Sequence, residues 1–168
     1  NQFGSKNPHD EIDDPLKSAK VLQAHVDEGL KFARKNRLPK PIANFIPEHQ
    51  GTLKMGYFLN KAEEKKLNFN ENDFRYKGPI PQSKETAILM LADGCEAALR
   101  AMDINASDSE ALETISKIFY SRQVDGQLND SDLSKGEIFL IKKSFLNVWK
   151  RIRHRRIQYP TTKNNTFS

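Results

Sequence analysis

Three residues that lie far apart in the sequence could together bind a metal ion: His25, His49 and Asp93. Two imidazoles with a carboxylate form a ligand set that suits iron, manganese or zinc, whereas calcium takes an all-oxygen set. The residues are separated by 24 and 44 positions, so they do not form a short metal motif such as HExxH. They could act together only if the fold brings three separate helices to one place, as metal sites in helical bundles do.

Each of the three also has a purely structural explanation. Asp93 lies in AILMLADGCEAAL, which predicts a helix that is apolar on nearly all sides and central to the core. An ionised carboxylate is costly there unless it binds a metal or is paired, and Arg100 on the same face is a candidate partner. His25 adjoins an apolar stripe beside Gly29 and could be an inward-facing, hydrogen-bonded core histidine. His49 stands where a short helix breaks and could be a surface histidine.

The helices that would position these residues are predicted from their start signals. Asp14 precedes Pro15, and an apolar stripe at helical spacing follows to about Asn36. A short helix is expected between Pro39 and Pro47. These two helices would carry His25 and lead directly to His49.

Three further helices are expected downstream. Ser83 is placed to cap a helix that runs to about Met102 and carries Asp93. Two more begin at capping-box pairs, Ser107 with Glu110 and Ser134 with Glu137. The Lys- and Asn-rich stretch 61–73 and the Pro-containing segment FRYKGPIPQSKE are expected to be variable chain and an ordered turn or loop. Because no useful strand-like alternation appears, the fold class is predicted to be all-α.

Composition limits the kinds of protein this can be. The chain has 168 residues, of which 37% are hydrophobic and 29% charged, which suits one folded domain rather than disorder. Its longest apolar stretch, residues 87–92, is far shorter than the roughly 18 residues of a membrane-spanning helix. Cys95 is the only cysteine, which excludes an internal disulfide or a zinc–thiolate cluster and favours a reducing compartment such as the cytoplasm.

The net charge of +5 is compatible with an anionic partner, and the basic residues concentrate in KRIRHRR at positions 150–156. Such a run is often a solvated helix end, favoured by the negative end of the helix dipole. The alternative is that it binds phosphate groups.

Five stretches of the sequence together resemble one protein family. They are NPHDEIDDPLKSAKVLQAHVDEGL, FIPEHQGT, FRYKGPIPQSKETAILMLADGCEAALRAM, DGQL and HRRIQYP. They resemble the C-terminal part of the HD-type phosphohydrolase domain of seven-transmembrane HD proteins, the family of cyclic di-AMP phosphodiesterases. The resemblance implies an HD-type helical domain over residues 1–160 that lacks its N-terminal helices. The polar residues 161–168 that follow are expected to form a flexible tail.

The resemblance also implies a role for each candidate ligand. In the family, two divalent transition-metal ions, expected to be iron or manganese, activate a hydroxide that hydrolyses a cyclic dinucleotide. His25 matches the His of the HV..G motif, His49 a His of EHHGT, and Asp93 the Asp of LAD. All three are therefore expected metal ligands, and His49 and Asp93 are the expected catalytic residues.

The chain departs from the family pattern in two ways. The early His and the adjacent His-Asp pair of the family are absent; His9 and Asp10 belong instead to the downstream NPHD motif. We therefore expect half of a metal site and no activity from this piece alone. Gln50 replaces the second His of EHHGT, and an amide cannot take up a proton at neutral pH.

Further expectations concern the partners. The closing motif places His154 and Arg156 as candidate contacts to substrate phosphates, and Arg75 and Lys84 beside the Pro-rich turn are weaker candidates. The resemblance implies upstream transmembrane and sensor regions that hold the domain at the cytoplasmic face of a membrane. The alternative function is a non-catalytic helical module that binds nucleic acid or an acidic partner through its basic C-terminal helix, with affinity that falls steeply as salt rises.

Overall fold

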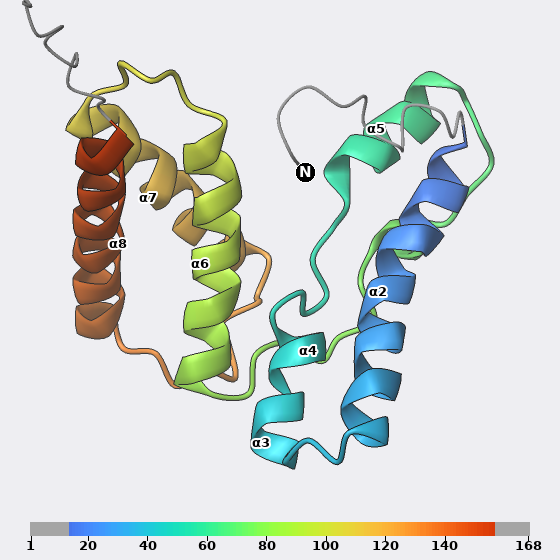
Figure 1. The fold of residues 1–168 in the computed structure, drawn as a ribbon. Coiled ribbons are helices and arrows are strands. Elements are labelled where there is room, and N and C mark those ends of the chain that lie inside the picture. The colour runs from blue at the N-terminus through green and yellow to red at the C-terminus, as the bar shows by residue number, and fades with distance from the viewer. Residues whose placement is uncertain (1–13, 157–168) are drawn as a thin grey trace, which may run out of the picture.

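The computed structural model describes residues 14–156, with side chains up to Arg153. This part of the chain is helical, which confirms the all-α prediction (Figure 1). Its elements are α2 (Pro15–Lys35), α3 (Lys40–Ala43), α4 (Phe45–Glu48), α5 (Gly56–Glu64), the 3-10 helix η1 (Glu71–Phe74), α6 (Lys84–Arg100), α7 (Asp108–Val124) and α8 (Lys135–Arg156). The tail 161–168 and the His9–Asp10 pair lie outside the described residues.

The predicted helix starts are confirmed by their capping contacts. Asp14 Oδ1 accepts hydrogen bonds from the backbone N–H groups of Leu16 (3.0 Å) and Lys17 (3.2 Å). The Ser107 capping box forms in both directions, and the Ser134 pair makes the same bonds: Ser134 N–H donates to Glu137 (2.9 Å) and Glu137 N–H to Ser134 Oγ (3.2 Å). These contacts satisfy N–H groups that a helix start would otherwise leave unpaired.

Two short elements were not predicted. Helix α5 and the 3-10 helix η1 each lie partly in the stretch 61–73, which was expected to be variable. Helix α5 has no side-chain cap at Met55, so the sequence carried no start signal for it. It is held instead by packing, because Met55, Phe58 and Phe74 share one hydrophobic cluster with α2.

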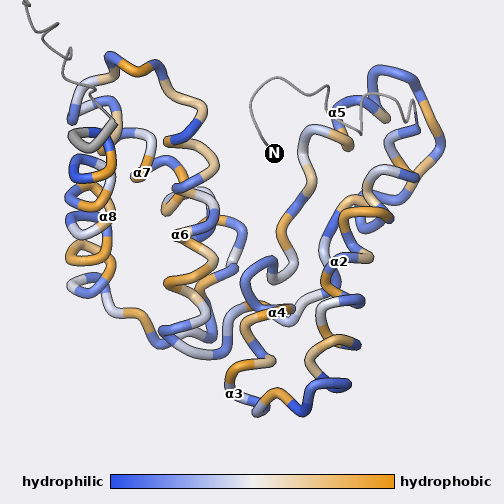
Figure 2. Tube along the Cα trace, in the orientation of Figure 1, coloured by the Kyte–Doolittle hydropathy of each residue, from blue (hydrophilic) through white to orange (hydrophobic). Residues whose placement is uncertain are grey.

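The helices form two groups. We call residues 14–82, with α2 to η1, the N-terminal half, and residues 83–156, with α6 to α8, the C-terminal half; Figure 1 shows them side by side. Each half has its own cluster of buried hydrophobic residues, and apolar positions alternate with polar ones along the helices of both (Figure 2). The first cluster is Ala19, Met55, Phe58, Leu59, Ala62 and Phe74, and the second is Leu91, Cys95, Ile115 and Phe119.

Helix α4 connects the halves, since it contacts both α2 and α6. The segment that follows it, residues 49–55, therefore lies at the junction of the two clusters. Among the described helices, none is long and apolar enough to cross a membrane.

Candidate functional site

The two predicted histidine ligands lie together. His25 in α2 and His49 at the end of α4 have ring centroids 6.0 Å apart, although 24 residues separate them in sequence. The ring of Tyr76 packs edge-on against His25 at 5.8 Å. The fold therefore brings the loop after η1 to the same place as α2 and α4.

Backbone contacts fix the orientation of His49. Its Nδ1 lies 2.7 Å from the carbonyl oxygen of Ile46 and 3.1 Å from that of Phe45, so Nδ1 carries the proton and donates it. The lone pair is then on Nε2, the arrangement that a metal-ligating histidine needs. Gln50 Nε2 donates to this atom at 3.1 Å and would have to turn aside for a metal to bind there. The donor chemistry of His49 thus fits a metal ligand.

Asp93 is not in the core, contrary to the prediction. Its side chain is exposed, while Leu91 and Cys95 on the same helix are buried. The sequence pattern suggested a helix covered on all sides, but Leu89, Asp93 and Glu96 are exposed, so one side of α6 is open. Arg100 is not the partner of Asp93, because it pairs with Glu96 at 3.2 Å.

His25 also differs from the expected inward-facing core residue, since it is exposed. The close packing on this face of α2 is made by Gly29 instead. A Cβ atom at Gly29 would lie 2.9 Å from Ile46 Cγ2, so the absence of a side chain lets α4 approach α2. That approach brings His49 to His25.

The charge of Asp93 acts on Tyr76, whose ring packs against His25. Burial raises the pKa of the Tyr76 hydroxyl, and the negative charge of Asp93 raises that pKa further. In the part of the chain that the structure describes, no three His, Cys, Asp or Glu side chains are arranged to hold a metal ion together.

A buried carboxylate, which the sequence analysis did not single out, joins the His49 segment to the Asp93 helix. Glu48 is 3% exposed, and its Oε2 accepts hydrogen bonds from the backbone N–H of Gln82 (2.9 Å) and the hydroxyl of Thr86 (2.7 Å). Since Glu48 precedes His49 and Thr86 lies two helical turns before Asp93, this contact ties the segment that carries His49 to the helix that carries Asp93.

The turn after His49 is held by a second buried polar residue. Gln127, 1% exposed, accepts a hydrogen bond from Thr52 N–H (3.0 Å) and donates to Thr52 Oγ1 (2.8 Å). Gly51 has φ +53°, and a Cβ atom there would lie 2.5 Å from Gln127 Oε1 and 2.6 Å from Met90 Cε. The Gly of HQGT and the Gln of DGQL are thus required for one close contact between the halves.

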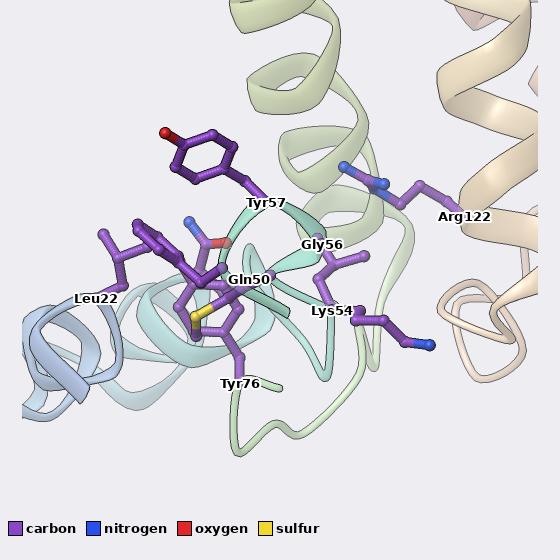
Figure 3. Close-up of a pocket in the computed structure, with 10 residues that line it drawn as sticks. Leu22, Gln50, Lys54, Gly56, Tyr57, Tyr76 and Arg122 are labelled. Atoms are coloured by element: carbon purple, nitrogen blue, oxygen red, sulfur yellow. The ribbon is translucent and has the colours of Figure 1, made fainter. Parts of the chain in front are cut away.

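A pocket of about 270 Å³ opens beside this turn (Figure 3). It draws residues from both halves: Leu22, Gln50, Leu53, Lys54, Met55, Gly56, Tyr57, Phe58 and Tyr76 from one, and Arg122 of α7 from the other. Tyr57 and Arg122 had no motif around them that would have pointed to a binding site.

Comparison with solved structures identifies the family. The fold matches the crystal structure of the HD domain of Listeria monocytogenes phosphodiesterase PgpH in complex with cyclic-di-AMP, with a TM-score of 0.84 and 34% identity. The match covers 90% of this chain and 70% of that one. The chain belongs to the PgpH HD-domain family. A second crystal structure of that HD domain gives a TM-score of 0.83 at 33% identity, over 92% of this chain and 71% of the other.

Sequence relatives agree with this assignment. The cyclic-di-AMP phosphodiesterases PgpH of Listeria monocytogenes and Bacillus subtilis are 35% and 36% identical over 98% and 95% of the chain. The Synechocystis protein slr0104, whose function is uncharacterized, is 46% identical over 95% of the chain. The chain spans only 20% to 23% of the length of these relatives. No family model matches the chain.

Two cations that were predicted to contact phosphate have protein partners in this PgpH-type domain. The Arg75 guanidinium donates to Asp125 (3.1 Å) and to the carbonyl of Thr52 (2.9 Å). Lys84 bonds Glu137 at 2.6 Å, and this hydrogen bond raises the pKa of Lys84. Both residues therefore join elements of the fold, and their contact with phosphate stays a prediction.

The basic C-terminal run is only partly described. Lys150 pairs with Asp108 at 2.5 Å, and Arg153 donates to the backbone carbonyl groups of Ala106 and Ile104. These contacts fasten the end of α8 to the start of α7. His154 and Arg156 belong to the last turn of α8, but their side chains lie outside the described part.

Proposed function

We propose that this chain is part of a metal-dependent phosphodiesterase that hydrolyses a cyclic dinucleotide, cyclic di-AMP. The observation that carries the proposal is the His25–His49 pair at 6.0 Å, on a fold that matches the PgpH HD domain with a TM-score of 0.84. The relatives named for this activity, and the crystal structure with cyclic-di-AMP bound, support the choice of substrate.

In this proposal His25, His49 and Asp93 hold divalent transition-metal ions, of which iron and manganese suit the ligand set. When bound, such ions lower the pKa of water and stabilise the charge on phosphodiester oxygens. His49 keeps its proton on Nδ1 through Ile46 O and presents Nε2 to the site. Asp93 supplies the carboxylate from α6, and its exposure leaves both oxygens accessible.

The proposal includes ligands outside this chain. The early His and the His-Asp pair of the family have no counterpart in residues 1–168, so we propose that turnover requires a segment that supplies them. We further propose that the site works in the cytoplasm, in a protein held at the membrane. A single buried, unpaired cysteine is compatible with that reducing compartment.

The test is hydrolysis of cyclic di-AMP by the protein expressed with whatever coding sequence precedes Asn1 in its gene. Asp93→Asn should lower hydrolysis at least about 100-fold, since even residues that only support a metal ligand cost 10- to 100-fold. The variant should also bind less iron or manganese by mass spectrometric metal analysis. Its melting temperature should change little, because Asp93 is exposed.

Glu96→Gln is the matched control, because Glu96 is also an exposed carboxylate on α6 and pairs only with Arg100. It should keep both hydrolysis and metal content. Full turnover with normal metal content in Asp93→Asn would overturn the assignment of this ligand. Absence of hydrolysis in the metal-loaded wild type would overturn the proposed activity.

A further inference from the structure

Arg122 lines the pocket as a cation with an unused donor. It reaches the pocket from α7, and in Figure 3 its guanidinium extends toward Gly56 and Tyr57. Its Nε is buried and has no hydrogen-bond partner in the described part of the chain. The hydrogen bond found there for the guanidinium runs from Nη1 to Ser121 Oγ at 3.1 Å. A guanidinium has five N–H donors, so this one bond leaves most of them free to bind an acceptor.

Gly94 makes room for this side chain. A Cβ atom at position 94 would lie 3.1 Å from Arg122 Nη2 and 3.2 Å from Ile118 Cγ2. Gly94, which follows Asp93, has no side chain, and this allows the Arg122 guanidinium to lie against α6. This packing holds Arg122 at the pocket rather than in solvent.

The position is unfavourable for a cation without an anion. Burial lowers the pKa of the Arg122 guanidinium, and the charges of Asp125 and Asp93 only partly oppose that effect. Asp125 is already engaged, because its carboxylate accepts hydrogen bonds from Arg75 (3.1 Å) and Gln127 (2.9 Å). A bound anion would supply the acceptor that Arg122 lacks.

The remaining lining suits a nucleoside. Tyr57, Tyr76 and Phe58 supply aromatic rings, and Gln50 supplies an amide that can donate and accept. Pockets for whole drug-sized ligands measure ~300–1,000 Å³. The pocket, at about 270 Å³, is therefore the size of one part of a dinucleotide. Lys54, the other cation in the lining, pairs with Glu71 at 2.5 Å.

We propose that Arg122 binds a phosphate of the nucleotide substrate while the adjoining aromatic pocket receives one of its nucleosides. This inference rests on the proposed function for its choice of a cyclic dinucleotide. It adds a substrate-binding residue from the C-terminal half, on the side of the junction that carries Asp93. Phosphate bound at Arg122 would lie near Asp93, because the guanidinium packs against Gly94, the next residue of α6.

The test separates phosphate recognition from base recognition. Calorimetric titrations compare 5′-AMP with adenosine, which differ only in the phosphate, on the wild-type protein and on Arg122→Gln. A charge-assisted hydrogen bond is worth about 1.5–3 kcal/mol, so Arg122→Gln should weaken 5′-AMP binding by about tenfold or more. Binding of adenosine should be unchanged. Arg34→Gln, which removes an exposed arginine of α2, is the matched control and should change neither affinity.

Unchanged 5′-AMP affinity in Arg122→Gln would overturn the inference, as would equal losses for both probes or failure of the wild type to bind either one. Hydrolysis of cyclic di-AMP, measured separately, tests the proposed function. If the protein hydrolyses cyclic di-AMP but Arg122→Gln leaves 5′-AMP affinity unchanged, only the role of Arg122 is overturned. If circular dichroism shows that Arg122→Gln does not fold, Arg122→Lys replaces it. Lysine keeps the charge but loses the two-pronged geometry, and should weaken 5′-AMP binding alone.

Discussion

Glu48 is a single side chain on which the geometry of the site depends. It is buried, and one of its oxygens accepts hydrogen bonds from Gln82 N–H, at the end of the N-terminal half, and from the hydroxyl of Thr86 in the C-terminal half. Removing it takes the acceptor from the part-buried N–H of Gln82 and leaves the buried hydroxyl of Thr86 with a longer bond, 3.2 Å, to the carbonyl oxygen of Ser83. A buried unsatisfied polar group costs about 1–3 kcal/mol.

We therefore predict that Glu48→Ala lowers the free energy of unfolding by about 2–3 kcal/mol, measured by urea denaturation. Thr86→Val removes one of the two donors, so the losses should not add: a double-mutant cycle should give a coupling of about 1 kcal/mol. Glu64→Ala, an exposed carboxylate in α5, is the control and should stay within about 0.5 kcal/mol. Additive losses for Glu48 and Thr86 would contradict the bond between them.

Residue types alone predicted part of the site. His25 and His49 were chosen as partners, and they lie together. Glu48, Gln127 and Arg122 were missed, because their importance comes from burial and from contacts made by other segments. A sequence pattern shows which residue types stand at which spacing, but not which polar side chain will be closed off from water.

At the scale of elements, α8 begins with an ion pair and a cap that act on one carboxylate. The hydrogen bond from Lys84 and the N–H and hydroxyl of Ser134 lower the pKa of Glu137 to about 2. The ordinary value is 4.5, so the folded state favours the ionised form. A carboxyl group whose pKa falls on folding stabilises the fold above its ordinary pKa and loses that contribution as the pH falls toward the folded value.

Glu137→Gln should accordingly lower the melting temperature by a few degrees at pH 7. The difference from wild type should shrink between about pH 5 and pH 2 and vanish near the folded pKa. Calorimetry across that range measures it. Lys117→Gln removes an exposed lysine that pairs with Glu113 at 2.7 Å and should leave this pH window unchanged. A difference that persists undiminished at pH 2 would show that the charge of Glu137 is not involved.

Capping chemistry explains which elements the sequence predicted. Helices α2, α6, α7 and α8 start at recognisable Asp or Ser signals, and each was expected. Helix α5 was not, since contacts with α2 rather than a capping side chain establish it. The exposure of Asp93 was predicted wrongly for a related reason: the apolar pattern of α6 does not reveal that one side of the helix has no neighbour among the described elements.

At the scale of the whole molecule, polar contacts run between the two halves, each of which has its own hydrophobic cluster. Glu48 with Thr86, Arg75 with Asp125, and Gln127 with Thr52 all cross from one half to the other. The candidate ligands are divided in the same way, with both histidines in the N-terminal half and Asp93 in the C-terminal half. We therefore expect that loosening these contacts separates the candidate ligands before either half unfolds.

Gln127→Leu should reveal this arrangement, because it keeps a side chain of similar size while removing the hydrogen bonds to Thr52. Trp149 is the only tryptophan and lies in α8, so its fluorescence reports on the C-terminal half, whereas far-ultraviolet circular dichroism reports on all helices. In the wild type we expect both signals to follow one thermal transition, as a cooperative domain requires.

In Gln127→Leu the midpoints of the two signals should separate, and 5′-AMP affinity should fall because the pocket draws on both halves. Gln123→Leu, on the exposed side of α7, should keep the midpoints together. Coincident midpoints in Gln127→Leu would mean that the apolar contacts of α4 with α6, and not the buried polar residues, make the two halves one unit.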